Sequence, residues 1–253
     1  MPRAAGMPRH FLAVVVLVVS VTSVSAQAPD AGYRMFRPDT PGSHPAVALV
    51  SGCDGFRPPM APALYERRAE HLRSLGHVVI FVDYLGRRAL QTCAGPITHD
   101  GAARDLVAAA RWLGSQASVD PSRITAMGWS FGGRAVLAAL ARHGDVPLGF
   151  SRAVVYYPDC RGLEPWKAAV PILMLLGGAD DMTPAGLCQE ALKRVPGPAA
   201  AVVRIVVYPG ALHAFDVPEL PARMRLGFAT IGHHPTAAAA ARKEVEQFLR
   251  GGR

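Results

Sequence analysis

The chain has 253 residues, 50% of them hydrophobic and 18% charged, which excludes a mainly disordered protein. It also lacks a three-residue glycine period and any repeat of 20 to 50 residues, so collagen-like and solenoid folds are excluded. The net charge of +8 comes almost entirely from arginine, in scattered pairs such as Arg67-Arg68 and Arg87-Arg88. Since nucleic acid binding needs clustered cations, we expect no nucleic acid partner.

The first 26 residues have the pattern of a signal peptide. Arg3 and Arg9 precede an apolar run at 11–19, and small residues end the segment at Val24-Ser25-Ala26. The alternative, a membrane anchor, needs about 20 apolar residues, and no later segment approaches that length. We therefore expect cleavage after Ala26 and export to the periplasm or the medium. At the usual size of domains, residues 27–253 then form a single domain.

Strands and helices alternate along the rest of the chain. Apolar runs rich in β-branched residues predict strands, and apolar residues at helical spacing predict helices between them. In chain order we expect strand 46–50, helix 62–75, strand 77–82, a helix over 103–113, strand 124–129, helix 132–142, strands 153–157 and 172–176, helix 184–194, strand 201–208 and a last helix over 238–248. This order predicts an α/β fold with a mostly parallel, doubly wound sheet between two layers of helices.

Two intervals break the alternation, 158–171 and 215–235. Each contains proline and glycine and has no clear helical period. We interpret them either as surface connections or as a wall or lid over a site.

The strand at 124–129 leads into Gly128-Trp129-Ser130-Phe131-Gly132, a Gly-x-Ser-x-Gly motif. The motif alone is weak, but here it lies between a predicted strand and a predicted helix. That is the setting of a nucleophile elbow, a tight turn that presents the serine hydroxyl at a helix N-terminus. We therefore predict that Ser130 is a nucleophile.

A serine hydroxyl needs a base, and His213 is the histidine that follows a late predicted strand, after the turn Pro209-Gly210. The pair His233-His234 is a competitor, or an adventitious metal pair, but no strand precedes it. We predict that His213 is the base and that no metal is bound.

The histidine needs a carboxylate, and two adjacent ones follow the strand at 172–176. We favour Asp180, which lies four residues before Pro184; Asp181 is the alternative, or it caps the following helix. The order Ser130, Asp180, His213 is that of the α/β-hydrolases. For the oxyanion we expect two backbone amides, those of Phe131 and Cys53.

Four cysteines in an exported chain favour two disulfides rather than a metal site, because no Cys-x-x-Cys or His-x-x-x-His spacing is present.

Several motifs together resemble the dienelactone hydrolase family of α/β-hydrolases: Gly52-Cys53-x-Gly55, Val119-Asp120-Pro121, Gly-Trp-Ser-Phe-Gly-Gly at 128–133, Tyr157-Pro158-x-Cys160, Asp180-Asp181-x-Thr183-Pro184, and Tyr-Pro-Gly-Ala-x-His-x-Phe-Asp at 208–216. The resemblance implies an eight-stranded-type sheet shortened at its start. It also implies hydrolysis of a small ester or lactone without a cofactor.

The resemblance has further implications and two departures. The founding enzymes use a cysteine where this chain has Ser130, and they bind the substrate carboxylate with two arginines. Arg87 matches one of these, which gives it a substrate-binding role, while the other is absent. The fold also implies the disulfides Cys53–Cys93 and Cys160–Cys188, out of three possible connectivities.

The sequence leaves rival functions open. A small serine peptidase or a polyester or cutin hydrolase could use the same three residues. A non-catalytic exported binding protein on a hydrolase scaffold is a different class, and it would be expected to lack one of them. We expect a serine hydrolase that cleaves small carboxylic esters or lactones.

Overall fold

The computed structural model describes Met1 and residues 33–56, 61–142, 147–166 and 169–251. Apart from Met1, the predicted signal peptide lies outside the described residues. In the described part of the chain, no helix has the length and apolar character needed to cross a membrane.

A seven-stranded sheet forms the centre of the molecule, in the order β1-β3-β2-β4-β5-β6-β7. Six of its strands are parallel, and β1 pairs with β3 in the antiparallel direction at one edge. The strands are β1 (Met35–Phe36), β2 (His44–Val50), β3 (Val78–Val82), β4 (Val119–Trp129), β5 (Arg152–Tyr156), β6 (Ile172–Gly177) and β7 (Val203–Tyr208). The strand order reverses between β2 and β4, so the loops after these two strands meet there, where α/β folds commonly bind ligands.

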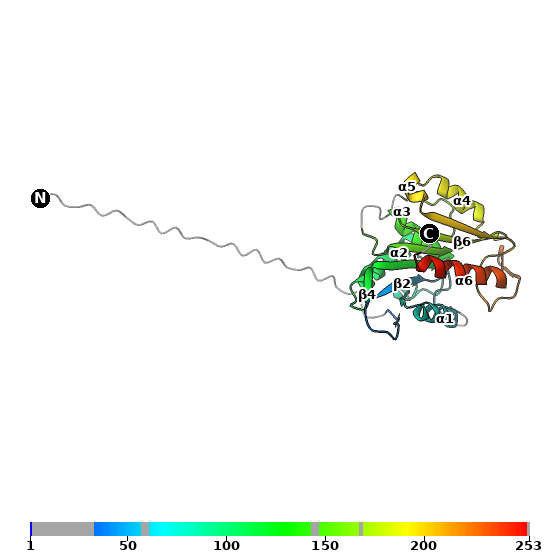
Figure 1. Ribbon diagram of the computed structural model, residues 1–253. Coiled ribbons are helices and arrows are strands. Elements are labelled where there is room, and N and C mark those ends of the chain that lie inside the picture. Colours follow the sequence, from blue (N-terminus) through cyan, green and yellow to red (C-terminus); the bar gives the residue numbers. More distant parts are fainter. Residues whose placement is uncertain (2–32, 57–60, 143–146, 167–168, 252–253) are drawn as a thin grey trace.

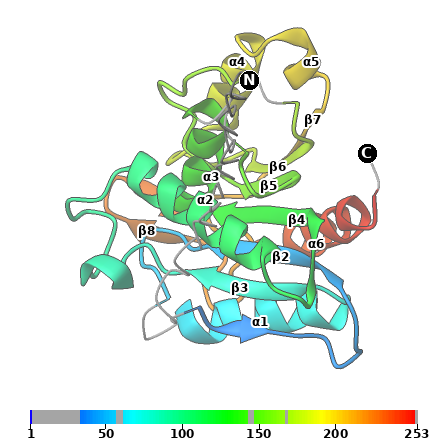
Figure 2. The same ribbon diagram turned by 90° about the vertical axis from the view of Figure 1, so that its left-hand side faces the viewer.

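Helices cover both faces of the sheet, with α1 and α6 on one face and α2, α3 and α4 on the other (Figures 1 and 2). Thr98 caps α2 by accepting a hydrogen bond from the Gly101 amide, and Pro235 opens α6. The helices are α1 (Ala61–Ser74), η1 (Gly86–Arg88), α2 (His99–Gly114), α3 (Phe131–Arg142), α4 (Ala185–Lys193), α5 (Gly197–Ala200) and α6 (Pro235–Leu249).

The alternation of side chains along each strand produces two cores. In β2, Ala46, Ala48 and Val50 pack toward α2 and α3, whereas Val47 and Leu49 pack toward α1 and α6. All five side chains are fully buried. Burial on both faces explains why the strands appear in the sequence as unbroken apolar runs.

The predicted fold class and the predicted strands and helices are present, with boundaries shifted by a few residues. The sequence analysis missed β1, η1 and α5, as well as a small hairpin formed by β8 (Met224–Leu226) and β9 (Ala229–Ile231). This hairpin lies in the interval 215–235, which is therefore not a plain surface connection. Of the other interval, 158–171, residues 167–168 lie outside the described part, and the remainder contains no helix.

Candidate active site

The Gly-x-Ser-x-Gly motif forms a tight turn between β4 and α3. Ser130 has a φ of 50°, and its amide donates to the carbonyl of Tyr156 in the neighbouring strand at 2.9 Å. A Cβ atom on Gly128 would lie 2.4 Å from the Gly132 carbonyl oxygen, and one on Gly132 would lie 2.3 Å from that of Ser51. Only glycine fits at these two positions, so the motif is required by the packing of the turn.

The histidine loop after β7 brings His213 to the serine. The Nε2 atom of His213 lies 3.0 Å from Ser130 Oγ, and its Nδ1 atom lies 2.8 Å from Asp180 Oδ2. Because a carboxylate only accepts, it favours the tautomer in which Nδ1 carries the proton. The Nε2 lone pair then faces the serine hydroxyl, which is the arrangement that general base chemistry requires.

Of the two adjacent carboxylates, the structure places Asp180 against His213. The Asp180 side chain is fully buried, and its Oδ1 accepts from the amides of Met182 and Thr183 at 2.9 and 2.8 Å. Asp181 does not cap α4, whose N-cap is Pro184, so that expectation was wrong. Its Oδ1 instead accepts from the Thr230 amide of β9 at 2.7 Å, and this hydrogen bond lowers the pKa of Asp181.

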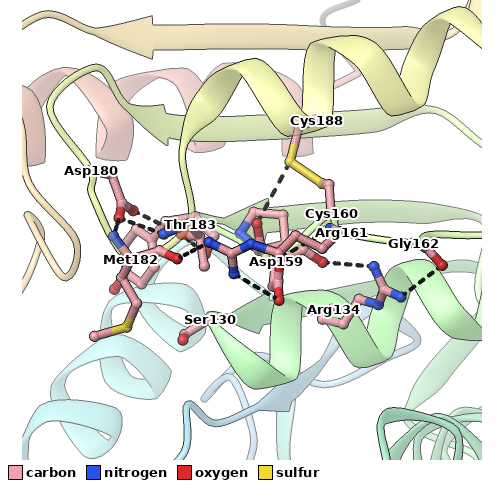
Figure 3. A network of polar contacts seen from close by, with 12 residues as sticks. Ser130, Arg134, Asp159, Cys160, Arg161, Gly162, Asp180, Met182, Thr183 and Cys188 are labelled. Carbon is pink, nitrogen blue, oxygen red and sulfur yellow. Dashed lines mark hydrogen bonds and ion pairs between the residues drawn. A yellow bond between two sulfur atoms is a disulfide. The ribbon is translucent and has the colours of Figure 1, made fainter. Parts of the chain in front are cut away.

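A network of polar contacts holds the loop that carries Asp180 (Figure 3). Arg161 donates to the Met182 carbonyl at 2.8 Å, and Arg134, on the helix that begins at the elbow, donates to the Asp159 carbonyl at 2.9 Å. Cys160 is joined to Cys188 of α4 by a disulfide. The interval at 158–162 thus links the elbow helix to the acid loop.

Strained backbone is concentrated around these side chains. Four non-glycine residues in the described ranges have a positive φ, and three of them are Ser130, Tyr157 at 37° and Ala214 at 60°. The ring centroids of Tyr157 and His213 lie 4.6 Å apart, and Ala214 directly follows His213 in the chain. Such strain persists only where the surrounding structure fixes it, and it is typical of functional sites.

The loop after β2 lies beside the serine. A Cβ atom on Gly52 would lie 3.9 Å from Ser130 Cβ. Tyr65 accepts from the Gly52 amide at 2.8 Å and Tyr84 donates to the Gly52 carbonyl at 2.6 Å, so two phenols fix the backbone on both sides of Gly52. Among the described residues, the amides of Cys53 and Phe131 have no acceptor, which leaves both free to bind an oxyanion.

The disulfides are Cys53–Cys93 and Cys160–Cys188, the two pairs implied by the family resemblance. The Cys93 amide also donates to the Cys53 carbonyl at 2.9 Å. One bridge therefore braces the loop expected to bind the oxyanion, and the other braces the loop next to the acid.

A largely buried carboxylate, Asp216, with 10% of its side chain exposed, lies three residues after the histidine. Its Oδ2 accepts from Arg68 at 2.5 Å and from the Trp129 indole at 3.0 Å, and its Oδ1 accepts from the Tyr157 hydroxyl at 2.6 Å. Burial and the neighbouring Asp216 charge raise the pKa of Tyr157 well above its usual value, so the phenol stays protonated and donates. The sequence analysis noted Asp216 only as part of the last motif and missed this role.

Arg87 and the histidine pair at 233–234 are the remaining candidates from the sequence. Arg87 is exposed in η1, and no hydrogen bond or ion pair within the described residues joins it to Ser130 or His213. His234 accepts from the Ala237 amide at 3.2 Å and caps α6, which explains its place in the sequence without a metal. The described part of the chain holds no cluster of three or more residues suited to a metal ion.

The sequence model of the Dienelactone hydrolase family matches residues 31–251. The chain belongs to the dienelactone hydrolase family. Its mostly parallel sheet between two layers of helices is the α/β-hydrolase fold.

Two relatives of this dienelactone hydrolase family member share about a third of their residues with it over the aligned stretch. It is 32% identical to an uncharacterised protein of Mycobacterium tuberculosis, over 71% of this chain and 66% of the relative, so it spans just under two thirds of that protein. A probable dipeptidyl-aminopeptidase B of Ajellomyces capsulatus is 31% identical over 35% of this chain, but over only 10% of its own length.

Solved structures share the fold. A putative dienelactone hydrolase from Klebsiella pneumoniae superimposes with a TM-score of 0.66 at 20% identity, covering 86% of this chain and 92% of that one. Propionate-bound esterase 2 of Thermogutta terrifontis gives 0.60 at 16% identity, covering 87% and 88%.

Proposed function

We propose that this family member is a serine hydrolase that cleaves small carboxylic esters or lactones through an acyl-enzyme. The observation that carries the proposal is the hydrogen-bonded chain from Ser130 through His213 to Asp180, with 3.0 and 2.8 Å between partners. These three side chains provide a nucleophile, a base and a buried carboxylate that orients the base. Water at the same site completes hydrolysis.

In the proposed reaction, His213 takes the hydroxyl proton while Ser130 Oγ attacks the ester carbonyl carbon. The amides of Phe131 and Cys53 donate to the oxyanion of the tetrahedral intermediate. The intermediate collapses as protonated His213 gives its proton to the leaving alkoxide, and the acyl group remains on Ser130. Water, deprotonated by His213, then attacks the acyl carbon; the bond to Ser130 Oγ breaks as protonated His213 returns its proton to Oγ, and the acid is released.

The direct test is turnover of p-nitrophenyl acetate and butyrate by the wild type and by Ser130→Ala. Removal of the nucleophile should lower the rate to the buffer background, because neither His213 nor the two amides can form the acyl-enzyme alone. A Ser130→Ala variant that is folded like the wild type by circular dichroism and still keeps its turnover would refute the assignment.

Turnover of carboxylate-bearing and neutral esters by Arg87→Gln tests the substrate-binding role that the family resemblance implies for Arg87.

A peptidase is the second candidate, because the chain shares a 93-residue stretch with the probable dipeptidyl-aminopeptidase of Ajellomyces capsulatus. The stretch covers 10% of that protein, so most of its length has no counterpart here. Dipeptidyl p-nitroanilides distinguish the two functions: we expect turnover of the esters and none of the anilides.

We also propose that the chain is exported and that residues 27–253 act as one domain. Two disulfides support export, since they persist in oxidising compartments. N-terminal sequencing of the protein from fractionated cells should find Gln27 first. An uncleaved N-terminus in the cytosolic fraction would contradict the proposal.

A further inference from the structure

A groove separates α1 from α6 on the face of the sheet opposite α2 and α3. It encloses about 400 Å³, a volume within the range of small-molecule sites. Its walls are mostly apolar, with Leu64 and Leu72 from α1, Val245 from α6, and Met127 and Trp129 from β4. Ser130 and His213 are not among its lining residues, so this α1/α6 groove is distinct from the candidate active site.

The floor of the groove contains a polar group without a partner. Tyr156, the last residue of β5, is 6% exposed, and its ring stacks on Trp129 at 5.3 Å. Side chains stand perpendicular to a sheet, so its hydroxyl points toward the helix layer, where the groove lies. Among the described residues that hydroxyl has no hydrogen-bond partner, and its oxygen is not enclosed by protein, so it opens into the groove that Tyr156 lines.

Two of the arginines that line the groove are already paired. Arg67 pairs with Glu219 and Arg68 with Asp216, and the Nε2 atom of His71 lies 3.0 Å from Glu246 Oε1. Arg242, on α6, is different.

Arg242 lines the groove and has no carboxylate within ion-pair distance in the described part of the chain. Burial raises the pKa of Tyr156, as does Asp216, while the charges of Arg68 and Arg242 lower it. The hydroxyl therefore remains a donor within the field of Arg242. A protonated phenol and an unpaired guanidinium together form a site for an anion.

We propose that the α1/α6 groove binds an aliphatic monocarboxylate, such as a medium-chain fatty acid. The carboxylate accepts from the Tyr156 hydroxyl and the Arg242 guanidinium, and the hydrocarbon chain packs along Leu64, Leu72 and Val245. One free arginine matches a single negative charge. The carboxylates of Asp216 and Glu246 next to the site would repel a doubly charged phosphate head.

The test is isothermal titration calorimetry with octanoate, with octanol as the matched probe that lacks the charge. We expect octanoate to bind the wild type, and octanol to bind at least about tenfold more weakly, because it lacks the charge-assisted hydrogen bonds. Arg242→Gln and Tyr156→Phe should each weaken octanoate binding about tenfold, and Ala238→Trp, which fills the groove, should abolish it. Equal binding of octanol, or wild-type affinity in Arg242→Gln, overturns the proposal.

Two controls locate the ligand. The Ser130→Ala variant, and wild type blocked at Ser130 with a phosphonate, should bind octanoate as the untreated wild type does. Loss of binding in either would place the ligand in the active site and overturn the proposal. Arg242 is exposed and outside the proposed machinery, so Arg242→Gln should keep its ester turnover. Light scattering tests whether a second copy of the chain occupies the groove instead. A dimer that is abolished by Ala238→Trp would make the groove a subunit interface and overturn the proposal.

Discussion

Asp180 and Asp181 are chain neighbours with separate structural roles. Asp180 is buried and its Oδ2 faces the His213 ring, whereas Asp181 is exposed and accepts from the amide of Thr230. The difference arises from the turn after β6, in which the Met182 and Thr183 amides converge on Asp180 alone. The turn, rather than the type of residue, selects the carboxylate that meets the histidine.

This separation predicts opposite results for two matched substitutions. In Asp180→Asn the amide nitrogen can donate to Nδ1, which favours the wrong imidazole tautomer, so kcat for p-nitrophenyl butyrate should fall by about 10⁴. Asp181→Asn keeps an oxygen acceptor for the Thr230 amide and should retain kcat near the wild-type value. A large fall in Asp181→Asn together with a small one in Asp180→Asn would reverse the assignment.

At the scale of elements, Asp216 joins three parts of the fold. It connects α1 through Arg68, the end of β4 through Trp129, and the start of the interval after β5 through Tyr157. The Arg68 guanidinium also stacks over the Trp129 ring at 4.2 Å. Since Trp129 precedes the nucleophile and Tyr157 packs on His213, this cluster holds the loops of the site in register.

Removal of the Asp216 charge should be strongly destabilising. The Arg68 and Asp216 side chains are 14% and 10% exposed, and breaking such a buried pair leaves an uncompensated charge. We expect Asp216→Ala to lower the free energy of unfolding by about 3–5 kcal/mol. The matched control is Glu219→Ala, which breaks the exposed pair with Arg67 and should change it by less than about 1 kcal/mol. Urea denaturation measures both, and similar losses would contradict the role given to Asp216.

The elements that the sequence predicted are those with strong local patterns. Five of the predicted strands, β2 to β6, have largely buried runs on both faces and appear as apolar runs, while β7 is half-buried but equally apolar in sequence, and the longer helices have clear spacing. The hairpin of β8 and β9 was missed because its strands have three residues each, too few to show a period. Its position depends on distant contacts, such as that between Asp181 and Thr230, which no local pattern reports.

The site was predictable to the extent that topology places strand ends together. Ser130, Asp180 and His213 each follow a parallel strand, so a fold prediction alone brings them to one edge of the sheet. The positions of Tyr84, Tyr65 and Asp216 depend instead on side-chain packing between elements far apart in the sequence. They have no spacing signal, which is why the sequence analysis did not assign these roles to them.

At the scale of the whole molecule, one buried histidine predicts how stability depends on pH. Burial, together with the charge of Arg123, lowers the pKa of His77 to about 4. Between the unfolded value near 6.5 and this folded value, the unfolded chain binds a proton that the folded protein does not. The stability conferred by neutral His77 is therefore complete above pH 6.5 and falls as the pH drops toward 4.

The size of this effect can be measured against His77→Gln, which does not titrate. Between pH 7 and pH 4 the wild type should lose on the order of 3 kcal/mol more free energy of unfolding than the variant does. Urea denaturation at the two pH values provides the comparison. Parallel losses in the two proteins would show that His77 titrates normally in the folded state.

The central claim is that His213 and Asp180 make the Ser130 hydroxyl reactive, and a covalent adduct tests it most directly. The wild type, Ser130→Ala and His213→Ala are treated with a fluorophosphonate, and the intact masses and peptides are measured. We predict one adduct per wild-type chain, on the peptide that contains Ser130, none at that peptide in Ser130→Ala, and labelling slowed by orders of magnitude in His213→Ala. An unlabelled wild type, or an adduct on a different serine, would contradict the account.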